Sequence, residues 1–243
     1  MVHGTLLRRD RVDPPYASGA RMRRTRLVFV EGVIGAGKTA TVQRLAAELG
    51  ERRIAASAIA EGDPKLRVAR SLTEPFAPWS TTTIDQYIEL CRLAWARLTS
   101  ENTGHVVFVS DGLLFHGNMT DLFLADASHD ELSRYLDVVL SAIAVLEPSL
   151  IYLDQTDVAA SLRATANVRG QHWIDYQVGW KLQAPYARTR ALSGLDGLIA
   201  MYERFAATCR AFVGEQRLPT LVSYDTEAWP RRVDAMLTWL ELR

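Results

Sequence analysis

Residues 27–39 read LVFVEGVIGAGKT, and this stretch decides the fold. Residues 27–30 are a short continuous apolar run, which is typical of a strand buried on both faces. From Gly32 to Thr39 the sequence fits the pattern G-x-x-x-x-G-K-[ST] without a mismatch. Val42, Leu45 and further apolar residues then recur at helical spacing up to Leu49. We therefore predict a strand, a glycine-rich turn and a helix in direct succession.

The residue types of this turn match what a phosphate group requires. Glycines allow the backbone N–H groups to turn inward around a phosphate, at a helix N-terminus whose dipole favours anions. Lys38 is expected to reach the β- and γ-phosphates, and the Thr39 hydroxyl to ligate Mg²⁺. The residues predicted to bind the nucleotide are Gly32, Gly35, Ala36, Gly37, Lys38, Thr39 and Ala40.

Further apolar runs alternate with helical patterns along the rest of the chain. The predicted strands cover residues 27–30, 54–60, 105–110, 150–153 and 219–224. The predicted helical regions cover residues 39–49, 81–100, 113–147, 156–217 and 229–240, the fourth interrupted at Arg163–Gln171 and at Ser193-Gly194. This alternation predicts an α/β domain in which helices cover both faces of a parallel sheet. Ligands of such sheets lie beyond the carboxyl ends of the strands, so the acids expected to matter are Glu74, Asp111, Asp154 and Asp225.

Composition limits the class of protein. The chain has 243 residues, 28 Lys and Arg against 28 Asp and Glu, and 48% hydrophobic residues. The balanced charge argues against a nucleic-acid binder, and no apolar run reaches the roughly 18 residues of a membrane span. Cys91 and Cys209 stand far apart and are expected to be small buried hydrophobic side chains. We expect a cytoplasmic protein with one domain at residues 26–243. Residues 1–25 are interpreted either as a disordered basic arm or as translation from an upstream start, with Met22 as the alternative start.

The lysines exclude one class of nucleotide-binding protein. Lys38, Lys65 and Lys181 are the three lysines of the chain, and they follow Gly37, Pro64 and Trp180. The Asn-Lys-x-Asp motif that reads guanine is therefore absent. The size and the remaining motifs favour a kinase of small molecules.

The segment Glu74-Pro-Phe-Ala-Pro-Trp79 resembles the Glu-Pro-x-x-x-Trp segment of deoxynucleoside kinases and viral thymidine kinases. The resemblance implies that Glu74 is the base facing the acceptor hydroxyl and that Trp79 lines the acceptor pocket. The same dipeptide at Glu147-Pro148 fits a helix end, so the dipeptide alone is not specific.

The order of the motifs is similar to that of the nucleoside/nucleotide kinase-like P-loop superfamily, thymidylate kinase-like in fold and nearer to deoxynucleoside kinases at the acceptor site. The resemblance implies a three-layer fold with a five-stranded parallel sheet, ATP with Mg²⁺ and a homodimer. It also implies that Asp111, after a buried strand, lies beside the metal, although an aspartate there can equally cap a helix. Arg163 and Arg169 fall where such kinases carry a lid, at about residues 163–172. Gly112 stands where relatives place an arginine, which argues against a nucleoside-monophosphate acceptor.

Several side chains have two interpretations. Arg92 lies on the polar side of the helix at 81–100, where it is a candidate for a substrate oxygen but where solvent exposure is the simpler expectation. His116 and His172 are expected on the polar surface. The stripe Trp173, Tyr176 and Trp180 is expected to pack in the core rather than against a base.

Three functions remain open. The leading hypothesis is an enzyme, an ATP-dependent kinase that phosphorylates a hydroxyl of a nucleoside, a nucleoside-like molecule or another natural product. The second is a nucleoside-monophosphate kinase, and the third is a nucleotide-binding regulator that transfers no phosphate. The sequence does not identify the acceptor.

Overall fold

The structure, a computed structural model, describes residues 25–68, 82–101 and 106–240. Outside these residues lie Glu74 and Trp79, and also the basic arm expected at residues 1–25, except for Thr25. The predictions for them therefore stay predictions.

Five strands form one parallel sheet, as the sequence predicts. Their order across the sheet is β2-β3-β1-β4-β5, so β1 lies at the centre. The apolar run at residues 27–30 explains this central position, because a central strand is covered on both faces and all five residues of β1 are buried. The strands are β1 Leu27–Glu31, β2 Ala56–Ile59, β3 Val107–Asp111, β4 Ser149–Asp154 and β5 Thr220–Tyr224.

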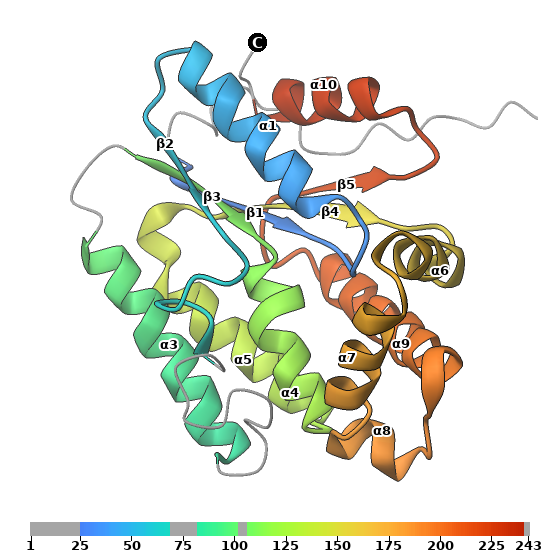
Figure 1. Cartoon of the computed structure of the whole chain (residues 1–243). Coiled ribbons are helices and arrows are strands. Elements are labelled where there is room, and N and C mark those ends of the chain that lie inside the picture. Colours follow the sequence, from blue (N-terminus) through green and yellow to red (C-terminus); the bar gives the residue numbers. More distant parts are fainter. Residues whose placement is uncertain (1–24, 69–81, 102–105, 241–243) are drawn as a thin grey trace, which may run out of the picture.

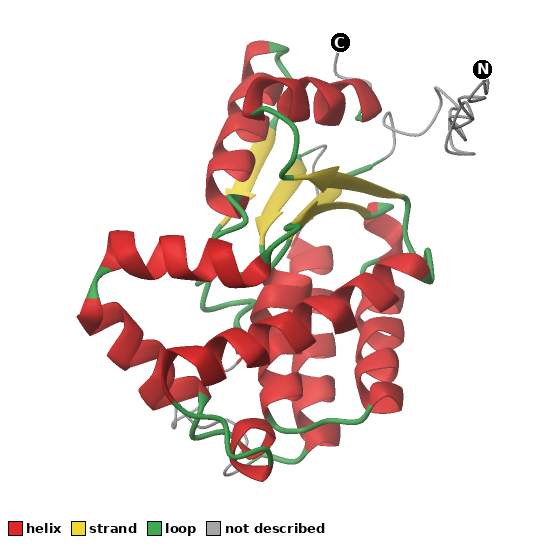
Figure 2. Cartoon of the chain, turned by 90° about the vertical axis from the view of Figure 1, so that its right-hand side faces the viewer, coloured by secondary structure: helices red, strands yellow, loops and turns green. Residues whose placement is uncertain are grey.

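Helices cover both faces of the sheet (Figure 1). Two of them, α1 Lys38–Glu51 and α10 Trp229–Trp239, lie on one face. The elements on or below the opposite face are α3 Ile84–Glu101, the π-helix η2 Leu113–Met119, α4 Thr120–Leu124, α5 His129–Ala142, the 3₁₀ turn η3 Ala144–Leu146, α6 Val158–Arg169, α7 Gln171–Lys181, α8 Pro185–Thr189 and α9 Gly194–Gly214. Figure 2 shows the strands as the middle layer between these helices. The predicted three-layer α/β fold is therefore confirmed.

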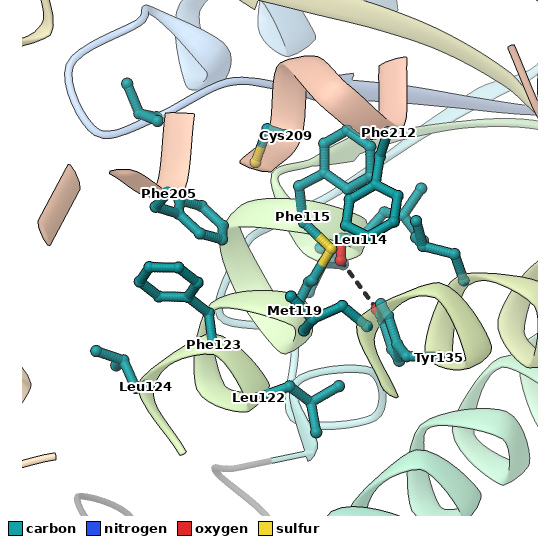
Figure 3. Packing of buried hydrophobic residues seen from close by; sticks show 14 of the residues in the cluster. Leu114, Phe115, Met119, Leu122, Phe123, Leu124, Tyr135, Phe205, Cys209 and Phe212 are labelled. Carbon is teal, nitrogen blue, oxygen red and sulfur yellow. Dashed lines mark hydrogen bonds between the residues drawn. The ribbon is translucent and has the colours of Figure 1, made fainter. Parts of the chain in front are cut away.

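The two faces of the sheet bury two separate apolar cores. Side chains of β1 alternate between them: Leu27 and Phe29 join the larger core, and Val28 and Val30 join the smaller core under α1 and α10. The larger core includes both cysteines, which are buried thiols as expected. Figure 3 shows how η2 is anchored in it, with Phe115 and Met119 among Tyr135, Phe205 and Phe212. The Tyr135 hydroxyl donates a hydrogen bond of 2.9 Å to the carbonyl oxygen of Leu114.

The predicted interruption at Arg163–Gln171 exists but is much shorter than expected. The helix α6 continues through most of this polar stretch to Arg169, and α7 begins at Gln171. The chain turns at Gly170, whose φ of 81° lies in the region that favours glycine. Polar residues on the exposed face of a helix do not interrupt it, and only the glycine at its end does. None of the described helices combines the length and the apolar character that crossing a bilayer requires.

Candidate active site

Three glycines give the phosphate loop its shape. Gly32, Gly35 and Gly37 have φ values of 150°, 80° and 88°, and residues with a Cβ rarely adopt these conformations. A Cβ on Gly32 would lie 2.7 Å from the carbonyl oxygen of Leu153, and a Cβ on Gly35 would lie 2.6 Å from the Thr165 hydroxyl. The loop is therefore packed closely against β4 and α6. It ends at the N-terminus of α1, where the helix dipole attracts anions.

Lys38 is a buried cation at this loop. Its ammonium donates a hydrogen bond of 3.2 Å to the carbonyl oxygen of Val33, within the loop itself. Burial lowers the pKa of Lys38, while the negative charges of Glu61, Glu31 and Asp111 oppose that shift. A bound polyphosphate would add further negative charge and favour the protonated form.

Thr39 and Asp111 meet beside the loop. The Thr39 hydroxyl donates a hydrogen bond of 2.6 Å to Asp111 Oδ2, although the two residues are 72 positions apart. The other carboxylate oxygen, Oδ1, is buried and has no hydrogen-bond partner in the described structure. A buried oxygen that is free to accept, next to a threonine hydroxyl, fits a hydrated Mg²⁺ that takes most of its ligands from phosphate and water. No group of three or more His, Cys, Asp or Glu side chains within residues 25–68, 82–101 and 106–240 could hold a metal on its own.

Gly112 follows Asp111 with a φ of 61°. A Cβ at this position would lie 2.7 Å from Cε of Lys38 and 3.3 Å from Cβ of His116. The lysine side chain thus occupies the space into which a side chain at residue 112 would project. This contact gives a physical reason for a glycine at residue 112.

A cavity of about 990 Å³ extends from the phosphate loop between η2, α6, α7 and α9. One part of it, the donor half, is formed by the loop and α6, and includes Gly35, Lys38, Thr39 and Ala40. The other part, the acceptor half, is lined by side chains from separate elements. They are Glu61, Arg67, His116, Trp173, Tyr176, Gln177, Trp180, Lys181 and Tyr202.

Glu61 and His116 lie together in the acceptor half. Glu61 comes two residues after β2, and its Oε1 is 3.5 Å from Nε2 of His116. Burial and the cations Lys38, Lys181 and Arg67 lower the pKa of His116 well below its usual value, so the ring is neutral. Its Nδ1 atom has no hydrogen-bond partner among the described residues.

Glu31 connects the phosphate loop with η2. Its carboxylate, at the end of β1, accepts hydrogen bonds from the backbone N–H groups of Leu114 at 2.6 Å and His116 at 3.0 Å. Burial raises the pKa of Glu31 to about 7, and these hydrogen bonds and Lys38 oppose the rise. The residue before the phosphate loop therefore fixes the helix turn that carries His116.

Arg67 is held in place by a buried network. Its guanidinium pairs with both carboxylate oxygens of Asp121, which also accepts a hydrogen bond of 2.6 Å from the Tyr87 hydroxyl. Asn118 in η2 binds the backbone on both sides of Arg67, with bonds of 2.9 Å to the Leu66 carbonyl and 3.2 Å from the Val68 N–H. Asp121 thus neutralises Arg67, and the network fixes where the guanidinium meets the cavity.

The predicted lid arginines and Arg92 have different surroundings. Arg169 lines the cavity and lies 5.7 Å above the ring of Trp173. Arg163 does not line it, and forms an exposed ion pair of 2.9 Å with Asp196. Arg92 pairs with Glu89 on the exposed side of α3, away from the cavity lining. Of these three residues, the structure brings only Arg169 to the phosphate loop's cavity.

Two expectations about aromatic and histidine side chains are wrong. Trp173, Tyr176 and Trp180 line the cavity, and Tyr176 is 47% exposed, so the stripe is not a core stripe. His116 is buried, whereas His172 is exposed as expected. A helical stripe of aromatic residues follows from periodicity, but periodicity does not tell a core from a cavity.

Sequence reasoning missed Glu31, Glu61, Arg67, Lys181 and Tyr202. One signal could have identified Glu61, because it is the acid directly after the second strand, whereas Glu74 comes 15 residues after Ile59. The acids after the last two strands have structural partners instead. Asp154 pairs with Arg210 at 2.8 Å, and Asp225 accepts hydrogen bonds from Thr156.

A comparison with protein families and with curated proteins found no match. Among solved structures, the chain is similar to deoxyadenosine kinase from M. mycoides with bound dCTP, with 12% sequence identity and a TM-score of 0.48. The aligned region covers 88% of this chain and 98% of that chain. The P-loop kinase-like fold implied by the motifs is seen in this chain's own architecture, with five parallel strands and the phosphate loop directly after β1.

Proposed function

We propose that this protein is an ATP-dependent phosphotransferase that moves the γ-phosphate to a hydroxyl group of a small molecule. The observation that carries this proposal is the continuity of the cavity, which runs from Lys38 and Thr39 of the phosphate loop to Glu61 and the polar side chains beyond it. Phosphoryl transfer requires a donor and an acceptor in line, in a site from which water is excluded. A cavity that joins the phosphate loop to a separate set of polar side chains offers room for a donor and an acceptor next to each other, which supports the proposal.

The donor half holds the triphosphate in this proposal. Backbone N–H groups of the loop and the ammonium of Lys38 bind the phosphate oxygens. Thr39 and Asp111 would hold Mg²⁺, which when bound neutralises charge on the terminal phosphates. Arg169, at the end of α6, is the lid arginine with direct access to the transferring group, while Arg163 would first have to leave Asp196.

Glu61 is the acceptor base that we propose. Its carboxylate lies in the cavity, and the neutral ring of His116 is close enough to orient it. A carboxylate within hydrogen-bond reach of the acceptor hydroxyl positions it and takes its proton late in the transfer, which is worth about 10²–10⁴-fold in rate. Glu74 remains the candidate that the Glu-Pro-x-x-x-Trp resemblance predicts, with Trp79 as the pocket wall.

The test is a screen of hydroxyl compounds with purified full-length protein and Mg·ATP, with ADP release as the readout. Thymidine and other nucleosides, dTMP and small sugar alcohols form the panel. The proposal requires ADP release that depends on an acceptor, and phosphorylated acceptor as the product. Slow hydrolysis that no compound accelerates would contradict it and favour a nucleotide-binding regulator.

A set of three variants identifies the base. Glu61→Gln is expected to lose about 10²–10⁴-fold in turnover while ATP binding is kept. Glu74→Gln tests the alternative base, and Glu147→Gln is a matched control, because Glu147 is also followed by proline and lies at the end of η3. Loss of turnover in Glu74→Gln alone would transfer the role to Glu74.

A further inference from the structure

Lys181 is a buried cation at the end of α7, 4% exposed, and it lines the acceptor half of the cavity. Its ammonium lies 3.8 Å from the ring centre of Trp180 and 5.6 Å from that of Tyr202. Within the described ranges it forms no ion pair with a carboxylate. Burial lowers the pKa of Lys181 to about 7, with Asp121 and Glu61 opposing and Arg67 and Lys38 reinforcing the shift.

Polar atoms without partners surround this cation. The indole N–H of Trp180, the hydroxyl of Tyr202 and Oε1 of Gln177 are buried and have no hydrogen-bond partner in the part of the chain that the structure describes. All three residues line the cavity. A buried polar atom without a partner costs about 1–3 kcal/mol, so several of them in one cavity wall indicate that a polar ligand completes the site.

The charges of the cavity wall are unequal. Lys38, Arg67, Arg169 and Lys181 line it, against one described carboxylate, Glu61. Lys38 belongs to the phosphate loop, and Asp121 neutralises Arg67 from behind. Lys181 therefore remains as the cation of the acceptor half that forms no direct ion pair with a described carboxylate, and Asp121 and Glu61 act on it without such a contact.

We propose that Lys181, with the indole N–H of Trp180 and the hydroxyl of Tyr202, forms a subsite for an anionic group of the acceptor, a phosphate or a carboxylate. This inference rests on the proposed function and names its substrate class: a small molecule that carries both a hydroxyl and an acid group. A desolvated ammonium, an N–H and an O–H are three donors, which is the kind of donor set that an oxyanion requires, and the nearby Gln177 also carries an NH₂ group that can donate.

The arrangement of the side chains fits an acceptor with two ends. The rings of Tyr202 and His116 are stacked with centres 6.3 Å apart, and His116 contacts Glu61. Tyr202 thus lies near both Lys181 and the Glu61–His116 pair. An acceptor could present its hydroxyl to Glu61 while its acid group meets Lys181. The missing arginine at residue 112 is then no argument against an anionic acceptor, because the cation comes from α7.

The three lysines of the chain allow a direct test. Protein labelled with ¹³C at lysine Cε gives one NMR signal for each, and Lys38→Met and Lys181→Met assign them. Lys38 reports the donor half, Lys181 the acceptor half, and Lys65, whose side chain is 62% exposed, is the internal control. The pKa of each lysine is measured in the free full-length protein, with Mg·ADP, and with Mg·ADP plus a probe.

The probes are matched pairs that differ in the acid group: ribose 5-phosphate with ribose, dTMP with thymidine, and glycerate with glycerol. We expect at least one acid of a pair to raise the pKa of Lys181 by about 1–3 pH units, as a nearby opposite charge does, while its neutral partner leaves it unchanged. If only the phosphates, or only the carboxylates, raise the pKa of Lys181, the result identifies the acid group that the subsite recognises. Lys65 should stay constant throughout.

The outcomes separate the two proposals. If Mg·ADP fails to change the Lys38 signal, the proposed function is wrong. If Lys38 responds but no acid changes Lys181, or if the neutral partner of each pair is bound and phosphorylated equally well, the anionic subsite is wrong. A response of Lys181 to Mg·ADP alone would assign it to the donor and also overturn the inference. In turnover, Lys181→Met should raise KM for the acid acceptor at least tenfold with a smaller effect on KM for ATP.

Discussion

The two halves of the cavity are built in different ways. The donor half is built around the backbone of one continuous segment, the phosphate loop, with α6 beside it, and its shape depends on glycines with positive φ and on the N-terminus of α1. The acceptor half is made of side chains from the β2–α3 connection, η2, α7 and α9. Both halves contain buried polar atoms without a described partner, namely Asp111 Oδ1 beside the phosphate loop and atoms of Trp180, Tyr202 and Gln177 in the acceptor half. The difference between the halves is therefore one of origin: the shape of the donor half is set mainly by the backbone of one loop, and that of the acceptor half by side chains from several elements.

Glu31 is a residue that connects the two halves of the cavity. It ends β1 directly before the phosphate loop, and its carboxylate accepts the N–H groups of η2. Lys38 and Gly112 form a second connection, because the lysine side chain covers the glycine. Variants at these positions test whether the halves act independently.

The largest effect is expected from Lys38→Ala. Removing a buried charge that stabilises the transferring phosphoryl group should lower turnover by about 10²–10³-fold. Lys65→Ala is the matched control, because Lys65 is an exposed lysine paired with Glu101. Initial rates of ADP release measure both. Intact turnover in Lys38→Ala would refute the assignment of the donor half.

Glu31→Gln should change how stability depends on pH. The folded pKa of Glu31, about 7, lies above the ordinary 4.5. This group therefore contributes stability that is present below pH 4.5 and is lost as pH rises through 7. At about 1.4 kcal/mol per pH unit, the loss amounts to about 3.5 kcal/mol. Glutamine does not titrate, so the difference in unfolding free energy between wild type and variant should vary with pH over this range.

Urea unfolding of both proteins at pH 4.5, 6 and 8 measures that difference. The lowered pKa of His116 works in the opposite direction, because a buried neutral histidine loses stability as pH falls. It is present in both proteins, so their comparison isolates Glu31. A difference that stays constant with pH would contradict the prediction.

Gly112→Ala tests the contact between the glycine and the donor lysine. The new Cβ would meet Cε of Lys38 at 2.7 Å, so the ammonium must move. A displacement of about 1 Å at a reacting centre can cost about 10²-fold in rate. The positive φ should cost a further 1–2 kcal/mol or so of stability. Gly50→Ala is the control, since nothing lies within 4 Å of a Cβ there. Equal turnover of the two variants would show that Lys38 adapts freely.

The sequence predicts the donor half because its chemistry is local. A single run of residues supplies the strand, the turn and the start of the helix, and each residue type has one physical reason. Asp111 was singled out because it follows a buried strand and because of the resemblance to P-loop kinases. The structure places β3 beside β1, and Thr39 meets Asp111 at 2.6 Å. The five strands and their positions along the chain were also predicted from local patterns, since a buried parallel strand requires an apolar run.

The acceptor half could not be predicted in this way. His116 was expected on the surface, but it is buried. Its burial results from tertiary packing, since Phe115 and Met119 fill the core and Glu31 holds the start of η2. The aromatic stripe of α7 has the period of a core helix, yet it faces a cavity. Such positions depend on the packing of several elements, and no local pattern encodes that packing.

The smallest effect concerns the pH dependence of acid binding at Lys181. Its pKa of about 7 in the free protein should rise when an anion binds, so binding takes up a proton above pH 7. The affinity for glycerate, or for whichever acid the probe pairs identify, should therefore fall about tenfold per pH unit above pH 7 and level off below it. Calorimetric titrations with Mg·ADP present, from pH 6 to 9, measure this slope.

The groups that act on Lys181 are Glu61, Asp121, Arg67 and Lys38, and Glu31 titrates in the same range. Lys181→Arg separates them, because arginine stays charged at these pH values and should keep the affinity while abolishing the slope. An equal slope in wild type and Lys181→Arg would assign the titration to another group and remove Lys181 from the acceptor half.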